Sequence, residues 1–183
     1  YQANNSLRPI YRKSGNTAYL YCANTYLQSN NTYQITSTHF VSTVFSRPSQ
    51  SGTFLFGTLG GTPSSRHAII GSASGNTMSG QVVRDANTFL ATSIIDTANT
   101  GLIQVYSSLT YPGLTDIMIN KDNQIFANNN LVANSWANNA IIQINTDSST
   151  MNWYGGVIIQ TDPGLTQRAY VDRYMGYKGG LTI

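Results

Sequence analysis

The stretch that decides the fold is Trp153-Tyr-Gly-Gly-Val-Ile-Ile-Gln-Thr-Asp-Pro-Gly-Leu-Thr-Gln-Arg-Ala-Tyr-Val-Asp-Arg-Tyr-Met-Gly-Tyr-Lys-Gly-Gly-Leu-Thr-Ile183. Its first part is apolar and β-rich, and Asp162-Pro163-Gly164 then predicts a turn. The remainder has the one convincing helical pattern of the chain, over residues 166–178. Thr166 is a suitable N-cap, and Gly179-Gly180 is a suitable left-handed stop. The stretch therefore predicts a final strand followed by a closing helix.

Helical spacing predicts which side of this helix is buried. We expect an inward face formed by four residues: Val171, Tyr174, Met175 and Lys178. We expect the polar residues between them to face water, namely Gln167, Arg168, Asp172 and Arg173. A helix of this length is marginal on its own, so it must dock on a sheet.

Composition favours a mostly β protein. About a third of the 183 residues are Asn, Ser or Thr, 9% are charged, and all seven acidic residues are aspartates. This composition suits short strands joined by polar turns, and helix formers are scarce. The length predicts one domain, 1–183, with a single core.

Strand patterns recur about every ten residues along the chain. Residues 1–16 are expected to be an extended N-terminal segment lying along a sheet, and Ser49-Gln-Ser-Gly52 is expected to join His39–Ser46 to Thr53–Phe56 as a hairpin. A second hairpin is expected over Asp116–Phe126, with its tip at Asn120-Lys-Asp-Asn123. This rhythm predicts an antiparallel two-sheet sandwich, and the lack of helical crossovers disfavours a parallel α/β fold.

Charge and cysteine content exclude several classes of function. The net charge is +3, but the ten basic residues are dispersed along the chain, so no nucleic-acid partner is expected. No apolar run is long enough to span a bilayer, so no membrane insertion is expected. The single Cys22 is expected to pack as a small apolar side chain. Because the chain lacks an initiator Met, we expect it to be processed or part of a longer polypeptide.

Short motifs at both ends resemble a known family. The matching pieces are Trp153–Ile159, Leu165-Thr-Gln-Arg168 and Tyr174-Met-Gly-Tyr-Lys-Gly-Gly-Leu181, together with Gln2-Ala-Asn-Asn-Ser-Leu-Arg-Pro9 and the hairpin around Asn120-Lys121. They resemble bacterial and phage domains of the concanavalin A-like, laminin-G-type jelly-roll superfamily. Lys121 stands where the family commonly has Gly, and the Trp-x-Asp-x-Ser-Gly segment of some members is absent. The resemblance implies an all-β jelly-roll sandwich with one short C-terminal helix.

The same resemblance implies several functions: carbohydrate binding, adhesion, virion decoration or glycoside hydrolysis. Hydrolysis is disfavoured because the related enzymes use paired glutamates on one strand, and this chain has no glutamate. The aspartates never form a close pair on one strand face. We therefore expect no catalytic residue and no enzymatic activity.

Metal and nucleophile sites are also sparse. His39 and His67 each stand near the start of a strand pattern, where a structural role is expected rather than general-base catalysis, and neither has neighbours at zinc-ligand spacing. Asn120 and Asp122 are candidate calcium ligands, although an ordinary Asx-turn explains them as well. No cofactor is expected, with calcium as the one open choice.

The candidate ligand site lies in the Asn-rich stretch 127–139. Sugar recognition needs an aromatic ring for the apolar face of a pyranose and amide groups for its hydroxyls. Trp136, Asn134 and Asn138, with Tyr111 from a neighbouring predicted loop, supply both. The alternative, that Trp136 covers the end of the sandwich and the asparagines only form turns, stays open. Trp153 is expected in the core.

These patterns lead to a non-catalytic carbohydrate-binding or adhesion domain of an extracellular, cell-surface or virion protein, such as a phage tail fibre. Its expected partner is a cell-surface glycan or polysaccharide. The alternative is a purely structural virion or surface-assembly protein that packs against copies of itself or a scaffold. Low charge with abundant Thr, Asn and Tyr fits both.

Overall fold

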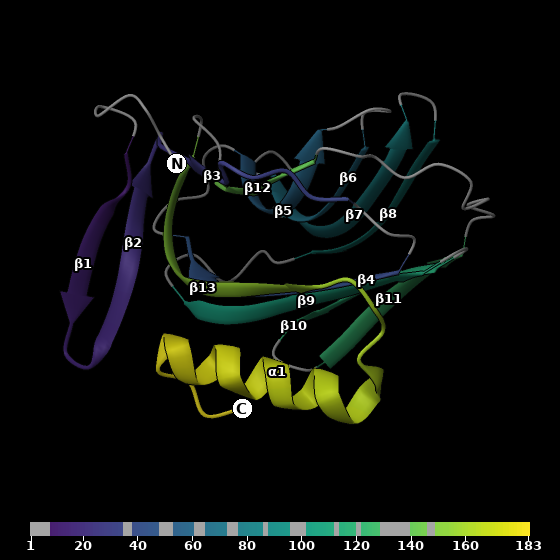
Figure 1. The fold of residues 1–183 in the computed structure, drawn as a ribbon. Helices are drawn as coiled ribbons and strands as arrows, with labels where there is room; N and C mark the ends of the chain where they lie inside the picture. The colour runs from purple at the N-terminus through teal and green to yellow at the C-terminus, as the bar shows by residue number, and fades with distance from the viewer. Residues whose placement is uncertain are drawn as a thin grey trace.

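The computed structural model describes residues 8–34, 38–47, 53–60, 65–72, 77–85, 88–95, 102–111, 114–119, 122–128, 140–145 and 149–183. Within them, strands form two antiparallel sheets that lie face to face, and one helix covers the outer side of the larger sheet (Figure 1). The antiparallel two-sheet sandwich with a C-terminal helix confirms the fold class that the sequence predicts.

The larger sheet has the order β1-β2-β13-β4-β9-β10-β11. Its strands are β1 (Ile10–Ser14), β2 (Thr17–Ala23), β13 (Thr150–Ile159), β4 (His39–Ser46), β9 (Ile103–Tyr111), β10 (Leu114–Ile119) and β11 (Asp122–Asn128). The smaller sheet has the order β3-β12-β5-β6-β7-β8. Its strands are β3 (Leu27–Gln28), β12 (Ile141–Ile144), β5 (Thr53–Gly60), β6 (Ser65–Ser72), β7 (Thr77–Asp85) and β8 (Thr88–Ile95). The helix α1 spans Gly164–Gly179.

The core between the sheets is aromatic and aliphatic. Buried side chains of Val41, Phe45, Phe56, Tyr106 and Met151 form one cluster, and the Phe45 and Tyr106 rings stack with centroids 4.7 Å apart. Gly156 of β13 makes the approach of the two sheets possible, because a Cβ there would lie 2.3 Å from Phe56 Cζ. The buried Cys22 and the buried His39 at the start of β4 agree with the packing and strand-end roles predicted for them.

The predicted hairpin between β4 and β5 is wrong, because the two strands belong to different sheets. β4 pairs with β13 on one side and β9 on the other, while β5 pairs with β12 and β6. All eight residues of β4 are buried, so the strand is covered on both of its faces and both of its edges. A Pro-containing segment between two β patterns fits a crossing between sheets as well as a hairpin.

The hairpin predicted around residue 120 is confirmed by the antiparallel pairing of β10 with β11. Asp122 and Asn123 already belong to β11, so the connection is shorter than predicted. The N-terminal segment contributes β1, which pairs with β2 from Ile10↔Tyr21 to Ser14↔Thr17. β1 forms the outer edge of the larger sheet in the described residues, and all five of its residues are exposed.

The helix begins earlier than predicted, so Thr166 is not its N-cap. The N-cap is Pro163, and the Asp162 carboxylate accepts a hydrogen bond from the Gly164 amide at 2.8 Å. Pro lacks an N–H, so it costs nothing at a helix start, where amides have no intrahelical partner. The predicted stop is confirmed, since Gly180 is the left-handed C-cap with φ of 77°.

The prediction for the polar face of α1 is right for Gln167 and Arg173, which are exposed. It is wrong for Arg168 and Asp172, which are buried against the larger sheet. Ser42 Oγ and Ser107 Oγ donate hydrogen bonds to Asp172 Oδ1 and Oδ2 at 2.8 and 3.0 Å. The Arg168 guanidinium lies 5.3 Å from the centre of the Phe40 ring. Two serines on the sheet surface therefore supply the donors that let a carboxyl group leave water.

Apolar packing completes the helix–sheet contact. Met175 forms a buried cluster with Val44 and Val105, as expected for an inward residue. Gly179 lets the last turn approach closely, because a Cβ there would lie 2.7 Å from methyl carbons of both Val44 and Ile103. Tyr174 and Lys178, also predicted to face inward, are both exposed, Tyr174 to 54%. The inward face of α1 thus carries buried charges and glycines, and a tyrosine expected inside lies outside.

Candidate functional site

The site predicted from the sequence lies mostly outside the described residues. Trp136, Asn134 and Asn138 belong to the undescribed range 129–139. Asn120 belongs to a separate undescribed range, 120–121. Tyr111 is the last residue of β9, where its backbone pairs with Leu114, rather than part of a loop. Asp122 is the first residue of β11. The side chains of Tyr111 and Asp122 are also outside the description, so the predicted sugar site and calcium ligands stay predictions.

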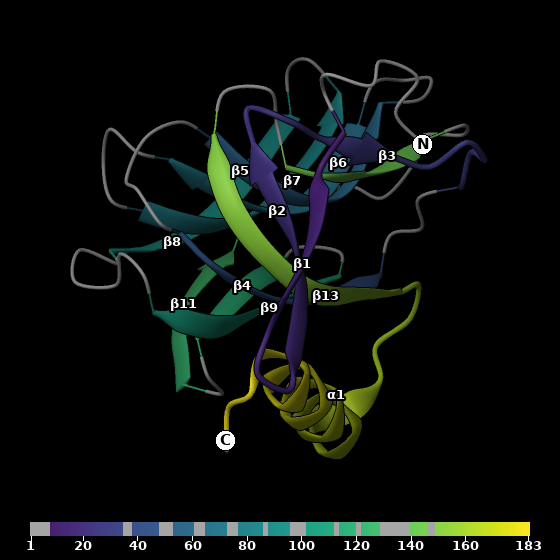
Figure 2. The same cartoon turned by 90° about the vertical axis from the view of Figure 1, so that its left-hand side faces the viewer.

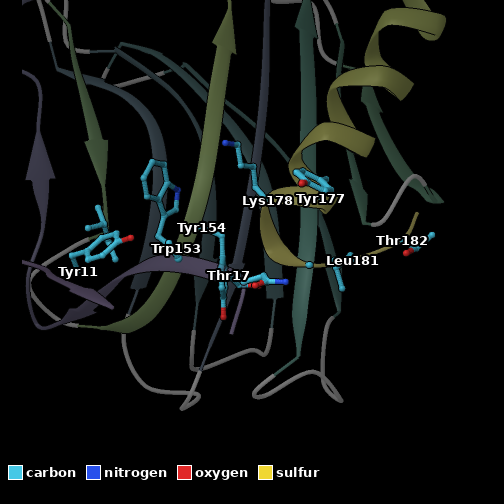
Figure 3. Close-up of a pocket in the computed structure, with 12 residues that line it drawn as sticks. Tyr11, Thr17, Trp153, Tyr154, Tyr177, Lys178, Leu181 and Thr182 are labelled. Carbon is cyan, nitrogen blue, oxygen red and sulfur yellow. The ribbon is translucent and has the colours of Figure 1, made fainter. Parts of the chain in front are cut away.

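A different site is evident in the described part of the chain. A cavity of about 680 Å³ opens between the β1–β2 hairpin, β13 and the C-terminal end of α1. We call it the fork pocket; Figure 3 shows its wall, with Tyr11 on the hairpin, Trp153 and Tyr154 on β13, and Tyr177 and Lys178 on the helix. Its volume is typical of a small-ligand site.

The fork pocket exists because the β2–β13 ladder ends early. The two strands pair from Thr150↔Ala23 to Trp153↔Leu20 and no further in the described residues. Beyond that point β13 continues along β4, whereas β2 runs on with β1 toward the end of α1 (Figure 2). Residues Thr17 and Ala18 of β2 therefore separate from β13 and become one wall of the pocket.

A β-bulge in β13 marks the point of separation. The register against β4 shifts between Trp153 and Gly155, so Tyr154 is the extra residue. Thr43 Oγ1 accepts a hydrogen bond from Trp153 Nε1 at 3.0 Å and donates one to the Gly155 carbonyl at 2.9 Å, which ties both sides of the bulge to β4. Bulges commonly redirect side chains at functional positions. Here the bulge gives the pocket two consecutive aromatic residues.

Neighbouring residues on β1 and β2 pack against these aromatic side chains. Tyr11, Leu20 and Trp153 stand directly opposite one another across β1, β2 and β13, so their side chains share one face. On the helix side, the Tyr154 ring lies 5.3 Å from the Tyr19 ring. Trp153 also packs against the inter-sheet core, with its ring 5.8 Å from that of Phe56. The prediction that Trp153 is a core residue is therefore right for one side of the ring, while the residue also lines the pocket.

The end of α1 forms the opposite wall. The Gly180 and Leu181 amides donate to the carbonyls of Tyr177 and Gly176 at 3.0 and 2.8 Å, which turns the chain back along the pocket. A Cβ at Gly180 would lie 3.2 Å from Thr17 Oγ1, so the helix end touches the tip of the hairpin. This contact sets the width of the fork.

The pocket wall combines rings, hydroxyls and one charge. Its lining residues are Tyr11, Asn16, Thr17, Ala18, Leu20, Trp153, Tyr154, Tyr177, Lys178, Gly180, Leu181 and Thr182. Lys178 is the single charged residue among them, and its ammonium nitrogen lies 5.1 Å from the centre of the Tyr174 ring. The wall has no carboxyl side chain, and no group of three metal-ligating side chains occurs in the described part of the chain. Such a wall offers a ligand stacking rings, hydroxyl and amide groups and one cation.

Sequence reasoning missed this site because its residues come from three separate segments. A usable signal was present in the consecutive Trp153-Tyr154 and in the tyrosines of the helix, which repeat at three- and four-residue spacing. The bulge and the early end of the β2–β13 ladder depend on register, which sequence patterns do not reveal.

Solved structures with the same fold include lectins and an enzyme. The chain is similar to the heptameric SAP-like pentraxin of Limulus polyphemus, with a TM-score of 0.63 and 10% identity over 93% of this chain and 78% of that one. It is also similar to galectin LEC-6 of Caenorhabditis elegans, with a TM-score of 0.50 and 7% identity over 73% of this chain and 89% of that one. The concanavalin A-like sandwich that the sequence motifs imply is thereby confirmed.

A phage protein shares the fold as part of a longer chain. The enzymatically active domain of tailspike protein 2 from bacteriophage CBA120 matches with a TM-score of 0.59 and 11% identity, over 91% of this chain but only 29% of that one. No family model and no curated protein sequence matches the chain. In the described residues, no helix is long and apolar enough to cross a membrane.

Proposed function

We propose that this chain is a non-catalytic carbohydrate-binding or adhesion domain of an extracellular, cell-surface or virion protein, and that its glycan occupies the fork pocket. The observation that carries the proposal is the wall of the pocket, in which four aromatic residues alternate with hydroxyl and amide groups. The concanavalin A-like fold, which galectin LEC-6 shares, supports the same class of function.

The chemistry of a sugar matches this wall. The C–H face of a pyranose stacks on aromatic rings, and its hydroxyls need donors and acceptors. Tyr11 and Tyr177, on opposite walls, are 67% and 76% exposed, so both keep ring surface for a ligand. Asn16, Thr17 and Thr182 add polar groups beside them. Trp153 is held by its hydrogen bond to Thr43, so little side-chain freedom is lost on binding.

The absence of hydrolysis is part of the proposal. The chain has no glutamate, and the two aspartates with described side chains are engaged elsewhere: Asp162 with the Gly164 amide and Asp172 with two serines. Glycosidases place two carboxyl groups about 5 to 9.5 Å apart around the bond that they cleave. No carboxyl side chain lines the fork pocket.

One observation favours the structural alternative. β1 is an exposed edge strand, and Ile10 and Tyr11 present apolar surface on it. Such an edge is a template for pairing with a second copy, although Arg12 and Lys13 on the same strand oppose this. A chain that assembles through β1 would be a stable oligomer in solution, which sedimentation measures directly.

The experiment is a glycan-array screen of the purified protein with two variants. Tyr177→Ala removes an exposed ring of the fork pocket, and we expect it to lower binding about fivefold, since one stacked aromatic contributes roughly 1 kcal/mol. Tyr33→Ala removes another exposed tyrosine, whose backbone pairs with Ala140 away from the pocket, and should leave binding unchanged. No binding to any glycan would refute the function, and equal losses in both variants would refute the site.

A further inference from the structure

The exposed charges around the fork pocket all have the same sign. On β1 and β2 the charged residues are Arg12 and Lys13, and both are exposed. On α1, Arg168 and Asp172 are buried, so its exposed charges are Arg173 and Lys178. Every exposed charged side chain on these three elements is therefore positive.

The nearest exposed carboxylate on a described side chain lies far away. Asp162 precedes α1, and the helical rise from Gly164 to Lys178 alone is about 21 Å. The Debye length at physiological salt is about 8 Å, so Asp162 does not offset the charge of Lys178. The chain's net charge of +3 adds to this local excess.

The aromatic surface of the pocket continues along the helix. Tyr170, Tyr174 and Tyr177 are spaced four and three residues apart, so their side chains fall within an arc of about 60° on the side of α1 away from the sheet. Each is more than half exposed. The Arg173 guanidinium lies 5.9 Å from the Tyr170 ring centre, and the Lys178 ammonium lies 5.1 Å from the Tyr174 ring centre. Aromatic rings and cations therefore alternate outward from the pocket.

We infer that the ligand of this site is an acidic glycan, a chain bearing sugar carboxylates, which enters the fork pocket at Lys178 and continues over the Tyr170–Tyr174–Tyr177 face of α1. This inference rests on the proposed function and specifies its ligand. Rings stack on the sugar faces, and Lys178 and Arg173 pair with the carboxylates. Lys13 adds a third cation, because it stands two residues from Tyr11 and so shares its face of β1.

Two local effects on an anion oppose each other at the helix end. The carbonyl end of a helix carries about half a negative charge, which disfavours an anion. Lys178 carries a full positive charge at the same end, and the Tyr177 and Gly176 carbonyls are occupied by the Gly180 and Leu181 amides. The balance is positive and favours a carboxylate over a neutral group.

A nucleic acid is the other polyanion that such a surface could attract. Tracking a phosphate backbone takes a line of six or more cations in typical duplex binders, whereas β1 and α1 together expose four, Arg12, Lys13, Arg173 and Lys178. The hydroxyl and amide groups in the pocket also suit sugar hydroxyls. The observations therefore favour a glycan, and single-stranded DNA serves as a competitor in the test.

The test is isothermal titration with matched probes. Polygalacturonate, alginate, hyaluronate and polysialic acid are each compared with their methyl-esterified, uncharged forms, at 50 and 300 mM NaCl. We expect at least one acidic form to bind, its esterified form to bind at least tenfold more weakly, and the affinity to fall with salt. Lys178→Gln should lower the affinity about fivefold, as for a partly exposed ion pair.

Arg12→Gln is the matched control for Lys178→Gln, because it removes one exposed positive charge from the β1–β2 hairpin instead of the helix. The Arg12 guanidinium lies 3.9 Å from the Tyr21 ring centre, on the face of β1 away from Tyr11 and Lys13. We expect Arg12→Gln to change the affinity less than twofold, and equal effects of the two variants would refute the assigned contact.

Esterified forms that bind as well as acidic ones would overturn the acidic ligand but leave the proposed function standing. If neutral glycans on the array and all eight probes fail to bind, both proposals fail. Displacement of the bound acidic glycan by a 12-nucleotide single-stranded DNA, added at the same concentration of negative charges, would overturn the glycan assignment.

Discussion

The two faces of α1 depart from the usual arrangement of an amphipathic helix. Its inner face buries Arg168 and Asp172 and two glycines, Gly176 and Gly179, whereas its outer face presents Tyr170, Tyr174 and Tyr177 to solvent. On an ordinary surface helix the charges would face water and the rings would face the sheet. The inner face therefore serves close approach and hydrogen bonding to the sheet, and the aromatic outer face is available for a ligand.

The largest expected effect is on the inner face. Asp172→Ala removes both acceptors of the Ser42 and Ser107 hydroxyls and leaves these donors buried. We expect it to lower the free energy of unfolding by about 3 kcal/mol in urea denaturation. Asp172→Asn keeps the shape and one acceptor and should lose less. A loss below about 1 kcal/mol for Asp172→Ala would show that the buried carboxyl group does not hold the helix.

The second effect tests the close approach of the inner face. Gly179→Ala places a Cβ 2.7 Å from methyl carbons of Val44 and Ile103, so we expect a loss of about 2 kcal/mol through overpacking. Gly155→Ala is the control, because its Cβ would lie 3.9 Å from the nearest Met175 and Lys178 atoms. Thermal denaturation should separate the two variants by several degrees. Equal melting temperatures would contradict the tight helix–sheet contact.

The third effect concerns the part of β2 that stays paired with β13. Cys22 is fully buried opposite Met151, and burial raises the pKa of its thiol from 9.0 to about 12, with the Thr25 hydrogen bond acting in the other direction. The neutral thiol is therefore favoured in the fold, so its contribution is complete below pH 9 and is lost as pH rises toward 12. At pH 10 we expect wild type to lose about 1 kcal/mol more than Cys22→Ala, relative to pH 8. If wild type and Cys22→Ala had identical pH profiles in urea denaturation, the thiol would not be buried, and β2 would already be separated from β13 at Cys22.

The smallest effect is expected on the outer face. Tyr174→Ala should change the free energy of unfolding by less than about 0.5 kcal/mol, because the ring is more than half exposed and lies next to the ammonium group of the exposed Lys178. The same urea series used for Asp172 measures it. A loss comparable to that of Asp172→Ala would mean that the tyrosine face is part of the core rather than a free surface.

Sequence patterns predicted the elements much better than their environments. The bounds of β4 and the stop of α1 at Gly179-Gly180 follow from local chemistry that involves only neighbouring residues. The burial of Asp172 could not be predicted, because its two partners lie 130 and 65 residues away in the chain. A charged residue on a helix is expected in water unless such donors are known to face it.

The candidate site was less predictable than the fold for a related reason. The sequence patterns assign Trp153 to the core because it opens an apolar strand segment. Its place at the mouth of a pocket depends on the bulge at Tyr154 and on the end of the β2–β13 ladder. Both are properties of pairing between distant segments.

The most direct test of the central claim uses the two tryptophans of the chain as separate reporters. Trp136→Phe leaves Trp153 as the only indole, and Trp153→Phe leaves Trp136. Each variant is titrated with the tightest-binding acidic glycan while its fluorescence is recorded. The account predicts a saturable change in the Trp136→Phe protein, where Trp153 lines the fork pocket, with its midpoint at the Kd from calorimetry. A saturable change only in the Trp153→Phe protein, with unaltered affinity, would contradict it and place the ligand at the Asn-rich stretch around Trp136.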